Sequence, residues 1–287
     1  MLRTLILSFL TLLLMTLPSQ AQQKFYPEAS EKAEVIFGKA RFTVLTPRLI
    51  RMEWASDSRF EDRATLGVVN RNLEVPRFDV KYGRSKVVIS TSDMTLTYMG
   101  QDRFSAENLS VSFRMADPKS RKGVKTVTWT PGMDESGNLL STARTLDKCD
   151  GTRTLEPYDK GVISRDGWAV VDESERHVFV PVENDWKYWV ECRPEGQRQD
   201  MYFFGYGHDY TAALADFTRI SGKIPLPPKY AFGYWWCRYW EYSDFELIDL
   251  AEHFKSYGIP VDVMIIDMDW HETWNKFPLR LLEANHI

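Results

Sequence analysis

Hydrophobic and polar positions alternate in short segments from about Lys24 to Gly205. Alternate residues in these segments are β-branched, aliphatic or aromatic, and turn pairs such as Gly38-Lys39 separate one segment from the next. Many short strands with turn signals at this spacing predict a β-sandwich. The segments with this pattern are 33–37, 42–45, 49–54, 86–91, 94–98, 109–115, 125–130, 162–171, 177–182, 186–192 and 201–204.

The hydrophobic period becomes helical after this region. Apolar residues recur at intervals of three and four from Tyr210 to Ile220, and Gly222 follows as a C-terminal cap. The next segment, KIPLPPKY (223–230), contains three prolines and cannot continue a helix. We therefore expect an N-terminal domain with its linking helix over 24–222, a linker over 223–230 and a second domain over 231–287.

The second domain begins with one complete βαβ pattern. Residues 231–236 predict a strand, Ser243 and Glu246 predict a helix that starts with a capping box, and Gly258 ends that helix. Residues 261–266 predict a second strand that is apolar on both faces. Strands of this kind belong to parallel sheets covered by helices. The pattern favours the start of a (β/α)8 TIM barrel, with a doubly wound sheet as the alternative.

The first 21 residues have the features of a secretory signal peptide. Arg3 gives a positive start, residues 5–17 are nearly all apolar, and Ser19-Gln20-Ala21 is a small-x-small cleavage site. The apolar run is short for a membrane span, and no other candidate span follows it. We expect signal peptide cleavage after residue 21 and a periplasmic or secreted product with no membrane partner.

Composition narrows the range of partners. The formal net charge is −4, and the absence of a basic stripe argues against nucleic acid. Aromatic residues make up 14% of the chain, including ten Trp, and indole rings both fill cores and stack on sugar faces. Composition alone leaves these two roles open.

The chain has an odd number of cysteines for an exported protein, namely Cys149, Cys192 and Cys237. One disulfide with a free thiol and three separate thiols fit equally well. No CxxC motif occurs, and no His is near enough in sequence to suggest a metal ligand pair. We therefore expect no metal site, no redox motif and no cofactor.

Two carboxylates follow the second predicted strand of the βαβ unit. Asp267 lies at its carboxyl end and Asp269 two residues later, at the edge of the sheet that carries the active site in α/β barrels. If the strand keeps its pleat, the two side chains point to the same side, roughly 6 to 7 Å apart. The alternative is a structural role, as a helix cap or as the partner of a cation such as Arg238. His271 is a further candidate to line a pocket there.

Several longer stretches resemble one enzyme family. LPPKYAFGYWWCRYWEYSDFELIDLAEHFKSYGIPVDVMIIDMDWHETW (226–274) resembles the start of the catalytic barrel of family 31 glycoside hydrolases, which are α-glucosidases, α-xylosidases and relatives. Upstream, LLSTARTLDKCDG, GVISRDGWAVVDES and YFFGYGHDYTAALADFTRISG resemble that family's N-terminal β-sandwich and its link to the barrel. The resemblance implies a sandwich of the galactose mutarotase type and a glycoside or oligosaccharide as substrate.

The resemblance also implies residue roles. The strand-end carboxylate hydrogen-bonds the sugar in the subsite that holds the non-reducing residue, and this role falls on Asp267. A loop of the sandwich reaches the pocket in this family, and SRDGW is the matching stretch, with a plain hairpin turn as the alternative. The other substrate-binding candidates are Trp236, Trp240, Trp270, Asp166 and Trp168.

The catalytic residues of the family have no counterpart in this sequence. Retaining glycosidases need two carboxyl groups about 5 to 5.5 Å apart, and the resemblance implies two Asp on later barrel strands, one within a W-x-D-M-N-E-like stretch. No such stretch occurs, and only 57 residues follow Tyr230, whereas a (β/α)8 barrel takes roughly 250. The sequence therefore predicts the N-terminal fragment of an exported retaining α-glycosidase, inactive alone and with a truncated barrel.

Three other functions remain as alternatives. The first is a non-catalytic carbohydrate-binding β-sandwich protein. The second is a small enzyme that uses Asp267 and Asp269, although two carboxylates on one strand cannot flank a glycosidic bond from both sides. The third is a mutarotase-like activity of the sandwich with His177 and Glu183, which are close in sequence.

Overall fold

The computed structural model describes residues 24–100, 102–117, 119–121, 123–140, 158–183, 188–224 and 226–267. The predicted signal peptide and three of the strand-end candidates, Asp269, Trp270 and His271, lie outside these ranges, as does Cys149. The chain divides into two compact units, with the boundary between Lys223 and Ile224. We describe each unit by itself.

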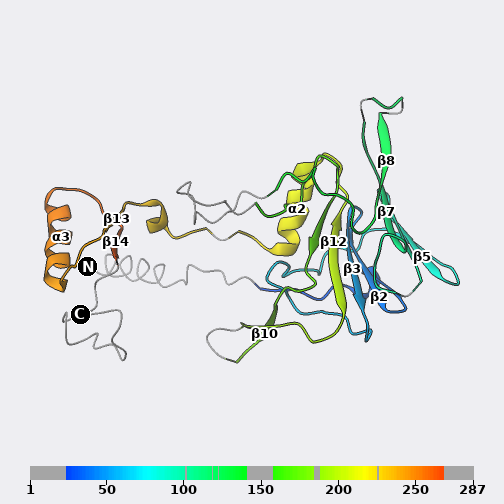
Figure 1. Ribbon diagram of the computed structural model, residues 1–287, viewed down its shortest axis with the longest axis horizontal. Helices are drawn as coiled ribbons and strands as arrows, with labels where there is room; N and C mark the ends of the chain where they lie inside the picture. Colours follow the sequence, from blue (N-terminus) through cyan, green and yellow to red (C-terminus); the bar gives the residue numbers. More distant parts are fainter. Residues whose placement is uncertain are drawn as a thin grey trace, which may run out of the picture. The chain divides into compact units, whose positions relative to one another are not determined.

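The first unit contains two five-stranded antiparallel sheets (Figure 1). The first sheet has the order β1-β2-β3-β12-β9, so that the late strands β12 and β9 extend a sheet begun by the first three. The second sheet has the sequential order β4-β5-β6-β7-β8. The bounds of the first sheet are β1 (Glu34–Phe37), β2 (Ala40–Thr46), β3 (Leu49–Ala55), β9 (Ala169–Asp172) and β12 (Arg198–Phe204). Those of the second are β4 (Asp79–Tyr82), β5 (Lys86–Ser90), β6 (Met94–Met99), β7 (Leu109–Ala116) and β8 (Val124–Trp129).

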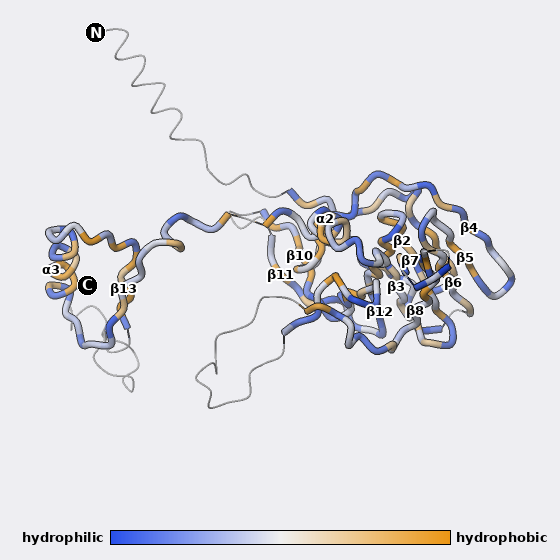
Figure 2. The backbone as a smooth tube through the Cα atoms, turned by 90° about the horizontal axis from the view of Figure 1, so that it is seen from above, coloured by the Kyte–Doolittle hydropathy of each residue, from blue (hydrophilic) through white to orange (hydrophobic). Residues whose placement is uncertain are grey.

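The two sheets face each other across a common hydrophobic core. Phe42, Met52 and Phe203 from the first sheet and Leu96 and Phe113 from the second belong to this core and are fully buried or nearly so. Figure 2 shows the hydrophobic positions along these strands. The sequence-based prediction of a sheet-rich N-terminal part is confirmed, and the core forms because each strand turns alternate residues inward.

Two differences from the expected strands have physical reasons. The pattern missed β4 (Asp79–Tyr82), an edge strand whose residues are mostly exposed and therefore carry no hydrophobic alternation. The segment 162–171 was expected to be one strand, but only β9 (Ala169–Asp172) is a strand of the sheet. Earlier in that segment the chain forms an isolated bridge between Asn138 and Ser164 instead.

The second face of the first sheet has a set of buried charged residues. We call them the buried ion cluster: Arg41, Arg51, Glu53, Arg193 and Asp200. Arg51 donates from Nε and Nη2 to the two carboxylate oxygens of Asp200, both at 2.8 Å. Arg41 Nε lies 2.7 Å from Glu53 Oε2, and Arg193 Nη2 lies 2.7 Å from Asp200 Oδ2. Arg51 and Asp200 are each 1% exposed, so these charges are compensated by each other and not by water.

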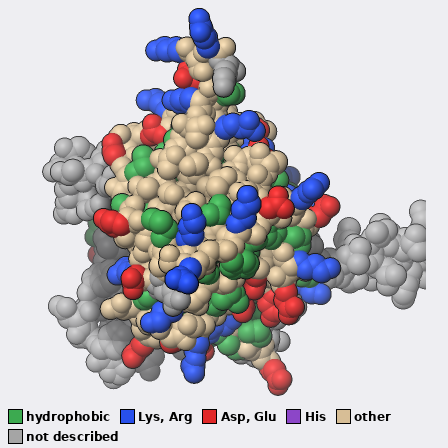
Figure 3. All heavy atoms as spheres, turned by 90° about the vertical axis from the view of Figure 1, so that its right-hand side faces the viewer, with side chains coloured by type: hydrophobic (Ala, Val, Ile, Leu, Met, Phe, Trp, Pro, Cys, Tyr) green, Lys and Arg blue, Asp and Glu red, His purple; other side chains and the backbone are tan. Residues whose placement is uncertain are grey.

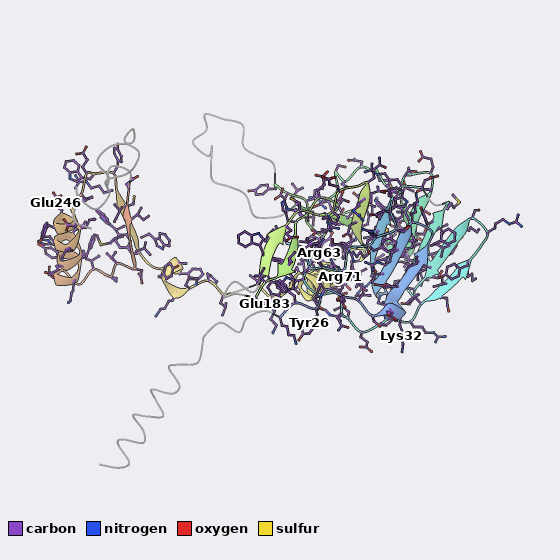
Figure 4. All side chains as sticks on the ribbon, turned by 90° about the horizontal axis from the view of Figure 1, so that it is seen from below. Tyr26, Lys32, Arg63, Arg71, Glu183 and Glu246 are labelled. Carbon is purple, nitrogen blue, oxygen red and sulfur yellow. The ribbon has the colours of Figure 1, made fainter. Side chains whose placement is uncertain are left out.

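Segments between the strands cover this face. Arg71 is 1% exposed and donates from Nε to the hydroxyl of Tyr202 on β12 at 2.6 Å. Its Nη1 donates to the backbone oxygens of Pro27 at 2.8 Å and Arg63 at 3.0 Å. Figure 4 labels Arg63 and Arg71 in this region. Arg71 therefore ties two covering segments to the sheet.

Further small elements complete the first unit. They are the 3-10 turn η1 (Glu31–Ala33) and the two-stranded antiparallel hairpin of β10 (Val178–Pro181) and β11 (Tyr188–Glu191). On the face of this unit seen in Figure 3, basic and acidic side chains are interspersed.

The first unit ends in helix α2 (Tyr210–Ser221), as the spacing of apolar residues predicted. Asp209 caps its start, because its side chain accepts from Ala212 N at 3.2 Å. The buried Ile220 packs on the sheet, and its carbonyl accepts from Val69 N at 2.9 Å. The helix is thus fixed to the first sheet and to its covering segment.

The second unit has the expected βαβ order, with β13 (Trp235–Arg238), α3 (Asp244–Ser256) and β14 (Val263–Ile266) preceded by the 3-10 turn η2 (Lys229–Phe232). The two strands are parallel. Ser243 and Glu246 form the predicted capping box at the start of α3, where Figure 4 labels Glu246. The first strand begins later than the expected 231–236, because the chain after Pro228 makes the turn η2 before it extends. No helix among the described residues has the length and apolar character to cross a membrane.

We expect Asp200→Asn to lower the free energy of unfolding by about 3 to 5 kcal/mol at pH 7, because it leaves Arg51 buried without its counter-charge. Urea unfolding of the variant and the wild type measures this difference. The matched control is Asp57→Asn, because Asp57 pairs with Arg198 but its own side chain is 42% exposed, so the substitution should cost much less. A loss for Asp200→Asn no larger than that for Asp57→Asn would contradict the prediction.

The same variant has an expected pH dependence. Burial alone would raise the pKa of Asp200, but the guanidinium groups of Arg51, Arg193 and Arg71 hold it well below its usual range. A carboxyl group with a lowered pKa in the folded state stabilises the fold above its unfolded pKa, near 3.9, and loses this contribution as pH falls toward the folded value. The difference in the free energy of unfolding between variant and wild type should therefore stay constant from pH 7 to 5 and shrink only below about pH 4.

Candidate functional site

The carboxyl ends of β13 and β14 meet at one edge of the second unit. The parallel register pairs Trp235 with Val263 and Cys237 with Ile265, and Asp267 follows β14 directly. Because side chains alternate along a strand, Asp267 lies on the same face as Ile265 and its partner Cys237. The thiol of Cys237 donates to Asp267 Oδ2 over 3.7 Å. The structure thus brings together the predicted carboxylate and a thiol that the sequence analysis did not select.

Asp262 aligns the two strands at their other end. Its carboxylate accepts from Tyr234 N at 2.9 Å, and its own N–H donates to Tyr234 O at 3.0 Å. Gly233 is needed beside it, because a Cβ at that position would overlap the Asp262 carboxylate. Asp262, directly before the apolar strand β14, is therefore a structural clasp, and it fixes the register that places Cys237 beside Asp267.

The electrostatics of this pair keep the thiol protonated. Local desolvation raises the pKa of Cys237, and the negative charge of Asp267 and the hydrogen bond to it raise it further. The thiol is then a donor to the Asp267 carboxylate, whose oxygens are acceptors of the kind that sugar hydroxyl groups bind. An acceptor-rich carboxylate at a strand end suits hydrogen bonding to a sugar.

The tryptophans of the second unit divide between two environments. Trp236 is half-buried and packs on Tyr242 and on Phe254 of α3, with ring centroids 5.7 and 6.0 Å apart. It lies on the opposite face of β13 from Cys237 and therefore opposite to Asp267. Trp240 is 52% exposed, and the guanidinium of Arg238, offered by the sequence as a partner for Asp267, lies over its ring at 4.7 Å from the centroid.

The SRDGW stretch of the first unit separates its two candidates. Trp168 is 4% exposed and packs in the common core against Trp129, with ring centroids 6.1 Å apart. Asp166 is exposed, and its N–H donates to Ser164 Oγ at 3.0 Å in the turn. The carboxylate of Asp166 lies against Gly137 at the surface, and the indole ring of Trp168 anchors the turn.

The residues offered for a mutarotase-like activity do not form a pair. His177 and Glu183 lie beyond opposite ends of β10 (Val178–Pro181), so the four residues of the strand, which span about 13 Å, and Val182 separate them. His177 instead contacts Cys192, with 3.5 Å between Nε2 and Sγ. In the sequence, no His lies close to a cysteine. The hairpin register brings His177 and Cys192 together from positions far apart in the chain.

A cleft of about 1060 Å³ lies beside β9 in the first unit. Its walls are mainly apolar, and one of its four acidic residues, Glu173, is 2% exposed. Burial raises the pKa of Glu173, against the opposing effects of Thr65 and Arg176. Glu173 could not be selected from sequence, because its burial results from contacts with segments far from it in the chain. Among the described residues, no group of three or more His, Cys, Asp and Glu is placed to hold a metal ion.

Comparisons with known proteins agree on one family. The family described as glycosyl hydrolases family 31, TIM-barrel domain, matches residues 224–282. An alpha-xylosidase of Saccharolobus solfataricus is 26% identical over 154 residues, which cover 51% of this chain and 20% of that protein. Alpha-glucosidase 2 of Bacillus thermoamyloliquefaciens is 34% identical over 83 residues, 29% of this chain and 10% of that protein. The chain thus spans at most about a fifth of these relatives.

A solved structure shows the same fold over most of the chain. The family 31 dextranase of Flavobacterium johnsoniae, complexed with isomaltotriose, aligns with a TM-score of 0.50 and 17% identity. The alignment covers 90% of this chain and 36% of that one. It includes both the sheet-rich first unit and the second unit.

We expect Asp267→Asn to lower the pKa of Cys237 toward its ordinary value, because the substitution removes the negative charge that disfavours the thiolate. The thiol should then be alkylated faster at pH 8. The pH dependence of iodoacetamide labelling, followed by mass spectrometry, measures this change. Cys192, in the first unit, is the internal control and should label at the same rate in both proteins. An unchanged profile for Cys237 would show that Asp267 does not contact it in solution.

Proposed function

We propose that this chain, which carries the N-terminal portion of a family 31 glycoside hydrolase, is part of an exported α-glycosidase that hydrolyses terminal α-linked sugars from oligosaccharides. The observation that carries the proposal is the position of Asp267 at the carboxyl end of a parallel strand within the matched segment 224–282. This is the edge of the sheet where α/β barrels bind their substrates. The names of the relatives, alpha-xylosidase and alpha-glucosidase, support an α-linked substrate.

The proposed architecture follows from the same family. We infer that the two packed sheets are a galactose mutarotase-like sandwich and that β13, α3 and β14 are the first βαβ unit of a TIM barrel. The parallel register of β13 and β14 and the clasp formed by Asp262 support the second part. The exposed apolar residues Phe245 and Ile248 on α3, 73% and 60% exposed, are then positions that further barrel elements would cover.

Asp267 is assigned to binding and not to catalysis. Retaining hydrolysis requires one carboxylate to attack the anomeric carbon and a second carboxyl group to protonate the leaving oxygen from the other side. A carboxylate at the end of one strand approaches the sugar from one side only. We therefore propose that the nucleophile and the acid/base belong to later barrel strands, and that Asp267 fixes the hydroxyl groups of the terminal sugar residue.

The surroundings of the other candidate residues decide which role we propose for each. Trp240 and Asp166 are exposed and remain proposed contacts to the substrate, as does Trp270, which lies outside the described residues. Trp236 packs on α3 and Trp168 in the core, so we propose that they support the site without touching the sugar. A non-catalytic sugar-binding protein has no observation in its favour beyond those that also fit the glycosidase.

The proposal is tested in an enzyme in which residues 1–267 are continued by the remaining strands and helices of a family 31 barrel. Two charge-assisted hydrogen bonds from Asp267 to sugar hydroxyls are worth roughly 3 kcal/mol. Asp267→Asn should therefore cut kcat/KM for an aryl α-glucoside or aryl α-xyloside at least tenfold while the circular dichroism spectrum stays unchanged. Asp249→Asn, an exposed carboxylate on α3, is the matched control.

The unextended chain provides a second control. It lacks the proposed catalytic pair and should hydrolyse neither substrate. Unchanged kinetics for Asp267→Asn in the extended enzyme would remove Asp267 from the substrate site. Turnover by the unextended chain that is lost in Asp267→Ala would instead support the small-enzyme alternative.

Export is the second part of the proposal, and it can be tested by itself. A signal peptide over residues 1–21 predicts that the mature protein begins at Gln22 and is found in the periplasm or the medium. N-terminal sequencing of protein recovered from each cell fraction tests this. Soluble cytoplasmic protein that keeps residues 1–21 would contradict it.

A further inference from the structure

A cysteine and a histidine meet at the base of the β10–β11 hairpin in the first unit. Val178 pairs with Glu191 in the antiparallel register, so the next residues outward, His177 and Cys192, face each other. Cys192 Sγ lies 3.5 Å from His177 Nε2. Both side chains are exposed, and Cys192 is in no disulfide. The fold therefore presents a thiol next to a nitrogen base at the surface.

The surroundings of this pair include a hollow and several guanidinium groups. His177, Arg176, Arg193 and Arg198 line a hollow of about 670 Å³. Arg193 Nε donates to Arg176 O at 3.1 Å, and its Nη2 pairs with the buried Asp200. The side chain of Arg198 is 10% exposed, and its buried Nε–H has no acceptor. The wall of the hollow is thus rich in guanidinium groups beside His177.

The second described thiol provides a contrast within the same chain. Cys237 is also exposed and free, but its neighbour is the carboxylate of Asp267. Local desolvation and that negative charge raise the pKa of Cys237. A thiol beside an imidazole loses its proton to a base, whereas a thiol beside a carboxylate is held protonated. Both cysteines are exposed, and they differ in the group beside them, an imidazole for Cys192 and a carboxylate for Cys237.

We propose that Cys192 is a modification site that forms a mixed disulfide with low-molecular-weight disulfides, with His177 as the base. His177 Nε2 takes the thiol proton, and the thiolate sulfur attacks one sulfur of the incoming disulfide. A new sulfur–sulfur bond forms to Cys192 as the old one breaks, and the leaving thiolate takes the proton from the imidazolium. Cys192 is oxidised and the reagent is reduced to one thiol. The hollow beside His177 gives room for the attached group.

This site is independent of the proposed glycosidase function, because it lies in the first unit and involves none of the sugar-site candidates. Its failure would leave the role of Asp267 untouched, and the reverse also holds.

The test uses the whole chain with Cys149→Ser, so that only Cys192 and Cys237 report. The probe is the uncharged bis(2-hydroxyethyl) disulfide at pH 7, and mass spectrometry of peptides gives a rate for each thiol. We expect Cys192 to react at least about threefold faster than Cys237. A tenfold gain in thiolate yields only about a threefold gain in rate, because nucleophilicity falls as acidity rises.

The matched variants separate the role of His177 from a general effect. His177→Gln keeps a polar side chain but removes the base, and should slow Cys192 at least about threefold while the rate of Cys237 stays unchanged. His208→Gln is the control, since His208 contacts the backbone oxygen of Arg165 and neither thiol. If His177→Gln loses its circular dichroism spectrum, His177→Asn replaces it. A rate for Cys192 at or below that of Cys237, or an unchanged rate without His177, would overturn the proposal.

Discussion

The first sheet depends on one arginine that bridges two carboxylates. Asp200 on β12 lies directly opposite Glu53 on β3, an arrangement of like charges that would by itself destabilise the strand pair. Arg51 Nη2 lies 2.8 Å from Asp200 Oδ2 and 3.0 Å from Glu53 Oε1. The guanidinium therefore turns a repulsion into a cross-strand link. Because β3 and β12 are distant in sequence, this link also decides which strand extends the sheet after β3.

The same cluster explains why this sheet has two buried faces. One face carries the apolar core, and the other carries charges that would ordinarily face water. Burial of those charges is tolerable only because Arg41, Arg51 and Arg193 meet carboxylates at close range and Arg71 closes the covering segment on Tyr202. The charges of this layer lie beside a second apolar cluster, which includes Leu49, Phe204 and Ile220.

Parts of this fold could be predicted from sequence because they rest on local rules. The alternation in β3 and β7, the spacing in α2 and the capping box of α3 each depend on residues within one element. The buried ion cluster could not be predicted, since Arg51 and Glu53 alternate with apolar residues just as solvent-facing residues do. Only β12, the partner strand of β3 that lies far along the chain and carries Asp200, shows that this face is covered. The same limit hid the contact of His177 with Cys192.

The candidate site also contains some residues that could be predicted from sequence and others that could not. Asp267 could be selected from sequence because an acidic residue after an apolar strand has a fixed place in a parallel sheet. Cys237 could not, because its contact with Asp267 depends on the register between β13 and β14, and that register depends on the hydrogen bonds of Asp262 with Tyr234. Trp236 and Trp168 match the family by position in sequence, but the side on which a ring lies is set by strand pleat and packing. A binding role for Asp267 therefore requires both the strand end and the clasp at the start of the strand, since a shift by one residue would turn the carboxylate to the opposite face.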